Sequence, residues 1–197
     1  MLLSFGHNCK DNKTPMTSIG IDELYEKIIT PADINLVGFT KNLRSVLKYS
    51  KERYRTMKTG LPFFSCSLFS PAIRTIKNFN SANGLVIDID QKSPISIEQI
   101  EQYKADQRIL MGYISPSNMG IKLIFSFDND ITDAALYTEY YKRFSHSFAS
   151  QYHLSGIIDQ KNCDVSRISF ICHDPEAWYN PDYIPLDVNT YEIEMSL

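Results

Sequence analysis

A short apolar strand that ends in two carboxylates constrains this chain more than any other stretch. The residues Gly-Leu-Val-Ile-Asp-Ile-Asp at 84–90 follow Asn83 and precede a turn-prone segment that ends at Pro94. This pattern predicts a buried strand. Because side chains alternate across a strand, Asp88 and Asp90 are expected on the same face, about 6–7 Å apart. Such a pair needs cations, hydrogen bonds or a metal nearby, and its hard oxygen ligands favour Mg²⁺ or Mn²⁺.

The totals of the sequence exclude several classes of protein. At 197 residues, 43% hydrophobic and 22% charged, the chain is long enough for one globular domain with a sizeable core. Its formal net charge of −3 means that any contact with nucleic acid comes from a local basic patch. No signal peptide or membrane-length apolar run is visible, and the 4 cysteines are scattered. We therefore expect a cytoplasmic protein with reduced thiols and no membrane partner.

Hydrophobic periodicity in the second half of the chain predicts alternating strands and helices. Strands are expected at 84–90, 108–115, 121–127 and 167–172, with helices that begin after Ser96 and Thr132. The order strand, helix, strand, strand, helix, strand is that of an RRM-like or ferredoxin-like fold, an antiparallel sheet with both helices on one side. The expected fold class is therefore α+β. The second of these helices carries an aromatic row every four residues, which is typical of core packing.

The first half of the chain predicts an N-terminal α/β lobe of the same domain. We expect a single domain over 1–197, with the lobe at 1–80, the RRM-like half at 81–180 and a tail at 181–197. Helices are predicted at 22–29 and at about 41–57, the second capped by Thr40, and a strand at 63–69. The second helix is strongly basic, which fits either a solvated face or an anion-binding surface that would meet the backbone of a nucleic acid. Its cationic residues are Lys41, Arg44, Lys48, Lys51, Arg53, Arg55 and Lys58.

Two further segments supply groups that complement the acid pair. The turn Ser-Pro-Ser-Asn-Met-Gly-Ile-Lys at 115–122 combines hydroxyls, backbone N–H groups exposed by a glycine, and an ammonium, which suits a triphosphate. Asp159 follows two β-branched residues, and Arg167 comes eight positions later. Three carboxylates suit a two-metal phosphoryl-transfer site, whose ions lie about 3.5–4 Å apart. Each signal alone also fits a turn, a cap or a structural strand, but their joint order is more specific.

This joint order resembles the archaeo-eukaryotic primase (primase-polymerase) superfamily. The likeness covers roughly residues 55–180 and looks closest to the bacterial branch often labelled the VirE N-terminal-domain family. The resemblance implies a primase-polymerase catalytic core with an RRM-like half. It also implies a template-directed nucleotidyltransferase that uses NTPs or dNTPs, a nucleic-acid template or primer, and Mg²⁺ or Mn²⁺. Many members of that branch have a helicase-like partner domain or protein.

The resemblance also assigns roles to individual residues. Asp88 and Asp90 match the first-motif metal ligands, and Asp159 matches the third-motif acid. Lys122 lies where many relatives have a histidine that contacts the phosphates of the incoming nucleotide. Asn118 replaces the usual glycine, and asparagine is the next best residue for positive φ. The other nucleotide-binding positions match Ser115, Ser117, Gly120 and Arg167.

Other interpretations of the same residues stay open. A catalytically degenerate relative would hold nucleic acid or nucleotide in the same groove without turnover, and a two-metal nuclease would use the same acids for hydrolysis. A zinc site would have to use Cys163, Cys172 and His173 without a Cys-x₂-Cys pair. P-loop NTPases and serine hydrolases are excluded, because the chain has neither Gly-x₄-Gly-Lys nor Gly-x-Ser-x-Gly.

Overall fold

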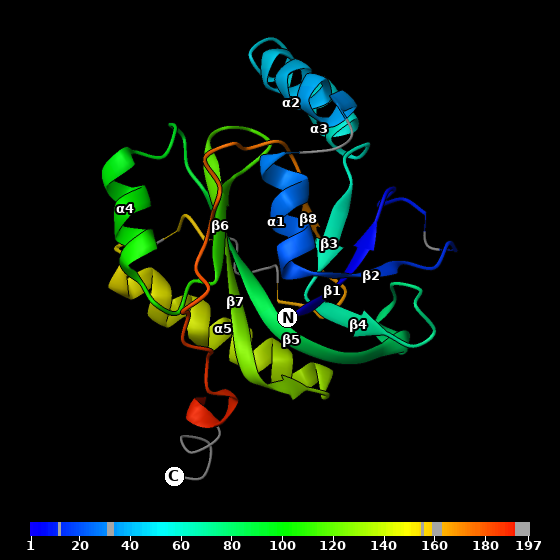
Figure 1. Ribbon diagram of the computed structural model, residues 1–197, viewed down its shortest axis with the longest axis vertical. Helices are drawn as coiled ribbons and strands as arrows, with labels where there is room; N and C mark the ends of the chain where they lie inside the picture. The colour runs from blue at the N-terminus through cyan, green and yellow to red at the C-terminus, as the bar shows by residue number, and fades with distance from the viewer. Residues whose placement is uncertain (12, 31–33, 155, 159–162, 192–197) are drawn as a thin grey trace.

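The structure is a computed structural model that describes residues 1–11, 13–30, 34–154, 156–158 and 163–191, and these residues form two antiparallel sheets with helices around them (Figure 1). The first sheet contains, in spatial order, β2 (Thr17–Gly20), β1 (Leu2–Gly6), β3 (Phe63–Ser65) and β8 (Ser169–Phe170). The second contains β4 (Ser67–Phe69), β5 (Phe79–Asp90), β7 (Gly120–Ile131), β6 (Met111–Ile114) and β9 (Trp178–Tyr179). The α+β class expected from the sequence is confirmed.

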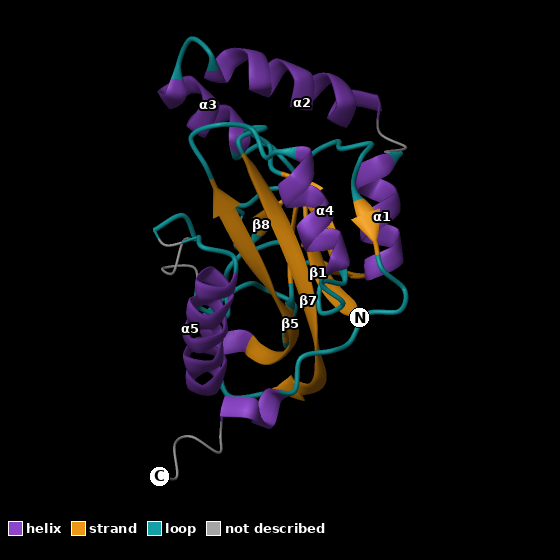
Figure 2. Cartoon of the chain, turned by 90° about the vertical axis from the view of Figure 1, so that its left-hand side faces the viewer, coloured by secondary structure: helices purple, strands orange, loops and turns teal. Residues whose placement is uncertain are grey.

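The helices lie on both sides of the second sheet. They are α1 (Ile21–Ile29), α2 (Ile34–Leu47), α3 (Lys51–Lys58), α4 (Ile97–Ala105) and α5 (Ala134–Gln151), with short 3₁₀ turns η1 (Ile76–Asn78) and η2 (Val188–Tyr191). Figure 2 shows α5 on one side of β5 and β7, and α1 with β1 on the other. The α2–α3 hairpin (residues 34–58) covers one end of the molecule in both views.

The side chains of β5 alternate between two cores, as the sequence predicted. Leu85, Ile87 and Ile89 are fully buried in the core that α4 and α5 share with the second sheet. Val86 points the other way, into the core between the two sheets. Asp88 and Asp90 lie on the Val86 side because they are two and four residues further along the strand. The acid pair therefore faces the N-terminal lobe.

Local signals in the sequence correctly predict most features of the helices in the second half. Ser96 and Gln99 form the expected capping box at the start of α4. The aromatic row of α5 packs as core: Tyr140, Phe144 and Phe148 are each at most 3% exposed. The N-cap of α5 is Asp133 rather than the expected Thr132, because its carboxylate accepts from the backbone N–H groups of the first turn at 2.7 and 2.9 Å.

The RRM-like topology is confirmed only for its first three strands. β5, β7 and β6 lie side by side with α4 and α5 as connections. The expected fourth strand at 167–172 is instead β8, which pairs with β3 in the first sheet, Phe63 opposite Phe170. Along β5 the free edge is taken by β4 at one end and by a single bridge from Ile158 to Ile89 at the other. Ile171, the residue that follows β8, is buried in the core between the two sheets. This packing holds β8 against the N-terminal lobe, where it pairs with β3 and not with β5.

The predicted helix at 41–57 is two helices. Ser50 adopts an extended conformation (φ −152°), and its hydroxyl accepts from the N–H of Arg53 at 3.2 Å to cap α3. Thr40 is not a cap, because it lies inside α2 and its buried hydroxyl accepts from the N–H of His173 at 3.1 Å.

The predicted strand at 63–69 is also divided. β3 joins the first sheet and β4 joins the second, with Cys66 at the crossing. The hydroxyl of Ser65 accepts from the N–H of Ser67 at 3.2 Å, so a local side-chain bond replaces sheet pairing at this bend. This stretch therefore connects the two sheets.

Candidate active site

The acid pair lies at the end of β5, next to the start of β7. Register places Asp88 opposite Lys122 and Asp90 opposite Gly120. Asp90 is exposed, whereas the Asp88 side chain is 20% exposed. The common face predicted for the two acids is therefore observed.

Lys122 is an internal counter-ion to Asp88. β7 lies between β5 and β6, so Lys122 is flanked by Asp88 on one strand and Tyr113 on the other. Its side chain is only 4% exposed, and its Nζ donates to Oδ2 of Asp88. An ammonium this deeply buried needs such a partner, because its desolvation costs several kcal/mol. Removing one partner of a buried ion pair typically lowers the free energy of unfolding by about 3–5 kcal/mol. The resemblance assigned Lys122 to phosphates, whereas cross-strand register pairs it with an acid.

The second oxygen of Asp88 meets the requirement for a metal ligand. Oδ1 is buried and accepts no hydrogen bond from any residue in the described ranges. A buried carboxylate oxygen without a donor is costly, and a hard cation would satisfy it. Asp88 and the neighbouring Asp90 are thus residues that fit Mg²⁺ or Mn²⁺. Within the described ranges, no group of three or more His, Cys, Asp or Glu side chains that could hold a metal is found. The described cysteines therefore form no such group with a histidine, and all four are free thiols.

Asp159, the expected third acid, lies outside the described residues. The described residues before it run beside the end of β5. Ile158 forms a bridge with Ile89, and the carbonyl oxygen of Ile157 accepts from the N–H of Asp90 at 3.3 Å. The chain thus passes the acid pair at the position immediately preceding 159.

The β6–β7 turn is held by its own small polar residues. The hydroxyls of Ser115 and Ser117 are 2.9 Å apart, and Ser117 Oγ accepts from the N–H of Met119 at 3.2 Å. Asn118 has φ +62°, the left-handed conformation that its side chain tolerates better than most. The expectation that asparagine replaces glycine here without loss of the turn is confirmed.

Gly120 is required where β7 meets the acids. A Cβ there would overlap the carbonyl oxygen of Ile89 and lie 2.9 Å from Oδ1 of Asp90. Gly120→Ala is expected to lower the free energy of unfolding by about 1–3 kcal/mol, measured by urea denaturation. Gly38→Ala is the control, because a Cβ at this helical position meets nothing within 4 Å and should be neutral or stabilise by up to about 1 kcal/mol. A Gly120→Ala protein as stable as the wild type would contradict this account of the turn.

The α2–α3 hairpin divides the predicted basic surface in two. One group of cations is exposed and points to solvent: Lys41, Lys48, Lys51, Arg53 and Arg55. Arg44 and Lys58 are only partly exposed and turn inward. Nη2 of Arg44 donates to the carbonyl oxygen of Ser115 in the β6–β7 turn at 3.5 Å. Burial, and then the charge of Lys122, lower the pKa of Lys58.

Tyr54 of α3 faces the same turn. It is 7% exposed, and burial raises its pKa to about 12 against an opposing effect of Ser117. Its hydroxyl is near that of Ser117 without meeting hydrogen-bond geometry, and no described residue pairs with it. A buried hydroxyl at this position adds a polar group to the site that the sequence did not single out.

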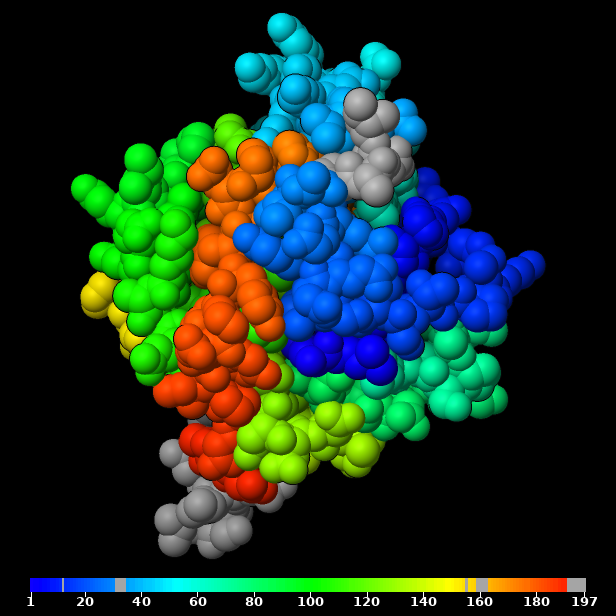
Figure 3. All heavy atoms as spheres, in the orientation of Figure 1, coloured from blue at the N-terminus to red at the C-terminus, as the bar shows by residue number. Residues whose placement is uncertain are grey.

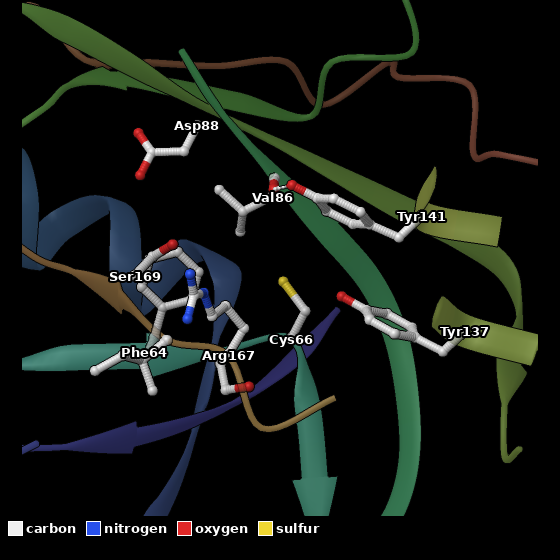
Figure 4. A pocket seen from close by; sticks show the side chains of 10 residues that line it. Phe64, Cys66, Val86, Asp88, Tyr137, Tyr141, Arg167 and Ser169 are labelled. Atoms are coloured by element: carbon white, nitrogen blue, oxygen red, sulfur yellow. Dashed lines mark hydrogen bonds between the residues drawn. The ribbon is translucent and has the colours of Figure 1, made fainter. Parts of the chain in front are cut away.

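Arg167 approaches the acids from the loop before β8. Together with Asp88 it lines a cavity of about 30 Å³, room for one or two waters (Figure 4). The view shows the guanidinium on the Asp88 side and the hydroxyls of Tyr137 and Tyr141 across the cavity. Asp88, its cross-strand neighbour Lys122 and Arg167 are thus brought to one region, whereas Asp159, the acid predicted for the third motif, lies outside the described residues.

Arg74 is a residue whose position the sequence did not reveal. Its two Nη groups donate to the carbonyl oxygens of Ser166 and Cys9, each at 3.0 Å, and its guanidinium lies 5.6 Å from the ring centroid of Phe63. It therefore ties the segment before Arg167 to the N-terminal loop. An isolated arginine in a loop belongs to no sequence pattern that would predict these contacts.

The BT4734-like N-terminal domain family matches residues 56–179. The chain belongs to this family. The matched domain contains the acid pair, the β6–β7 turn, Lys58 and Arg167, and it excludes all five exposed cations of the α2–α3 hairpin named above. The narrower placement in the VirE N-terminal-domain branch stays a prediction.

Two solved structures resemble this one. The AEP domain of the cyanophage S-2L primase-polymerase has a TM-score of 0.46 and 11% identity, over 95% of this chain and 84% of that chain. The polymerase domain of Mycobacterium tuberculosis ligase D, in complex with DNA, has a TM-score of 0.42 and 14% identity, over 58% of this chain and 47% of that chain. No curated protein matches the sequence. Identities this low transfer no residue roles.

No helix in the described ranges is long and apolar enough to cross a membrane. Figure 3 shows the C-terminal segment, in orange and red, lying over the surface next to α4 and α1.

Proposed function

We propose that this chain is a metal-dependent, template-directed nucleotidyltransferase domain of the primase-polymerase type. The observation that carries the proposal is the convergence of the acid pair of β5 with cations and hydroxyls from α3, the β6–β7 turn and the loop before β8. Acids that fit Mg²⁺ or Mn²⁺ next to groups that suit a triphosphate are what nucleotidyl transfer requires.

The residues of the site fall into two groups, those that would bind metal and those that would bind phosphate. Asp88 and Asp90, with Asp159 as third acid, would hold the divalent ions. Such ions, when bound, neutralise the leaving pyrophosphate and lower the pKa of the attacking hydroxyl. Ser115, Ser117 and the backbone around Gly120 would orient the nucleotide phosphates, with Arg167 as a counter-charge, while Lys122 would hold Asp88 in position. Positioning and charge neutralisation then supply most of the catalysis, and no protein nucleophile is needed.

The proposed context follows the family resemblance. We place the chain in the bacterial VirE-like branch of the primase-polymerase superfamily, in the cytoplasm, with NTPs or dNTPs, a template and primer, and a helicase-like domain or protein as partners. The residues that support this placement are those matched in the motifs at 84–90, 115–122 and 157–167.

A second function is favoured by one specific observation. Asp88 is already neutralised by the buried Lys122, as it would be in a relative that binds nucleotide or nucleic acid without turnover. A labelled primer–template incubated with dNTPs or NTPs and Mn²⁺ separates the possibilities. Extension supports the transferase. Retention of the intact duplex supports the binding module, and shortening supports a two-metal nuclease.

The exposed cations of the α2–α3 hairpin are proposed to contact the template backbone. Replacing Lys41, Lys48, Lys51 and Arg55 together by alanine is expected to weaken binding of labelled single-stranded DNA by tenfold or more at low salt. The slope of log affinity against log salt should fall by about 0.7 for each DNA phosphate that the variant no longer neutralises. Fluorescence anisotropy at several salt concentrations measures both. Lys142→Ala, an exposed lysine of α5 on the other side of the second sheet, should leave the slope unchanged. An unaltered slope in the fourfold variant would remove the hairpin from the template path.

A further inference from the structure

Lys58 is the last residue of α3, and its side chain turns away from the exposed cations of its own helix. Its Nζ lies 5.4 Å from the ring centroid of Phe170 in β8 and 6.0 Å from that of Tyr54 in α3. One ring belongs to α3 and the other to β8, and the faces of aromatic rings attract a cation. The end of a helix also favours a positive charge. The ammonium is therefore held at a defined place between the α2–α3 hairpin and the first sheet.

Lys58 differs from the other inward-facing cations of the site in its partners. Lys122 is paired with Asp88, Arg74 donates to two carbonyl oxygens, and Arg44 donates to Ser115. Lys58 has no ion pair within 4.0 Å and no hydrogen bond to any residue that the structure describes. A partly buried ammonium without an anionic partner is costly, and an anion that enters the site would relieve that cost.

The charges around Lys58 indicate which anion this would be. The carbonyl oxygen of Phe170 accepts from the hydroxyl of Tyr113 at 2.9 Å, and Tyr113 lies opposite Lys122, the partner of Asp88. Lys58, at the ring of Phe170, is therefore in the same region as the acid pair. A free carboxylate or phosphate would be repelled by the two acids alone. A triphosphate that arrives with divalent ions brings its own compensation for those acids and still carries oxygens for a lysine, which binds phosphate as a point charge.

We propose that Lys58 binds a phosphate group of the incoming nucleoside triphosphate, so that α3 serves two ligands, the nucleotide with Lys58 and the template with its exposed face. This inference rests on the proposed function. It reassigns Lys58 from the nucleic-acid-binding set predicted by the sequence. The juxtaposition that carries it is an unpaired ammonium, fixed by Tyr54 and Phe170, beside an acid pair that fits divalent ions.

The test compares Lys58→Met with Arg55→Met on the outer face of the same helix. Methionine keeps the apolar stem against the rings and removes the charge. Isothermal titration with dATP and Mn²⁺ is expected to show about 10–100-fold weaker binding for Lys58→Met, while labelled single-stranded DNA binds within twofold of wild type. Arg55→Met should weaken binding of the single-stranded DNA and leave dATP binding within twofold of wild type. Deoxyadenosine, which has no phosphate, should not distinguish Lys58→Met from wild type.

The Lys58 variants are expected to fold, so a loss of binding can be assigned to the missing charge. Removal of an unpaired buried charge is expected to leave the midpoint of urea denaturation unchanged or raised. Lys58→Gln should reproduce the loss of dATP binding, and Lys58→Arg, which keeps the charge, should retain most of it.

Two results would overturn the inference. One is a Lys58→Met protein that binds dATP as tightly as wild type. The other is a Lys58→Met protein that loses DNA binding as much as dATP binding. If wild type and the Asp90→Asn variant bind dATP with Mn²⁺ equally weakly, the proposed function itself fails. If wild type binds dATP tightly, Asp90→Asn binds it weakly and Lys58→Met binds it as tightly as wild type, only the role of Lys58 fails.

Discussion

Primer extension is expected to fall by at least about 10³-fold when Asp88 and Asp90 are both replaced by asparagine. The reason is that the variant lacks the carboxylates that would hold the divalent ions, which contribute several kcal/mol to the transition state. A gel assay with labelled primer–template, dNTPs and Mn²⁺ measures the loss. Persistent extension in the double variant would rule out the proposed site.

The two single variants differ in their expected effect on folding. Asp90 is exposed, so Asp90→Asn removes a ligand with little effect on folding. Asp88→Asn also leaves the buried ammonium of Lys122 without its counter-ion and is expected to destabilise the protein. Asp182→Asn, an exposed aspartate of the C-terminal segment, is the matched control and should extend primers like wild type.

The largest expected effect on stability belongs to Lys122→Met. It leaves the carboxylate of Asp88 in a site where only 20% of the side chain is exposed, with no cation in hydrogen-bond contact among the described residues. Loss of one partner of such a pair costs about 3–5 kcal/mol, and the partial exposure of Asp88 favours the lower value. Urea denaturation, with the slope held to that of the wild type, measures the change.

A double-mutant cycle isolates the ion pair. Asp88→Asn combined with Lys122→Met removes both charges, so we expect the double variant to be more stable than either single variant. Strictly additive losses would show that the two side chains do not interact in solution. The cycle measures only free energies of unfolding, so its result is independent of whether the protein transfers nucleotides.

The site could be foreseen from the sequence where its residues are neighbours in the chain. Alternation in β5 was enough to place Asp88 and Asp90 on one face, because that periodicity is a property of the strand itself. The positive φ of Asn118 followed in the same way from the tolerance of one side chain. By contrast, the inward direction of Lys58 and the contacts of Arg74 depend on segments more than 60 residues away. No pattern within a helix or loop encodes such contacts.

The sequence by itself determined the α+β class, the capping box of α4, the core-facing row of α5 and the shared face of the acid pair. Only the tertiary structure decided that 63–69 divides between two sheets, that β8 pairs with β3, and that Lys122 neutralises Asp88. The physical reason is one of range. Capping and periodicity act within a turn or between alternate residues, whereas strand partners and buried ion pairs are selected by the packing of the whole chain.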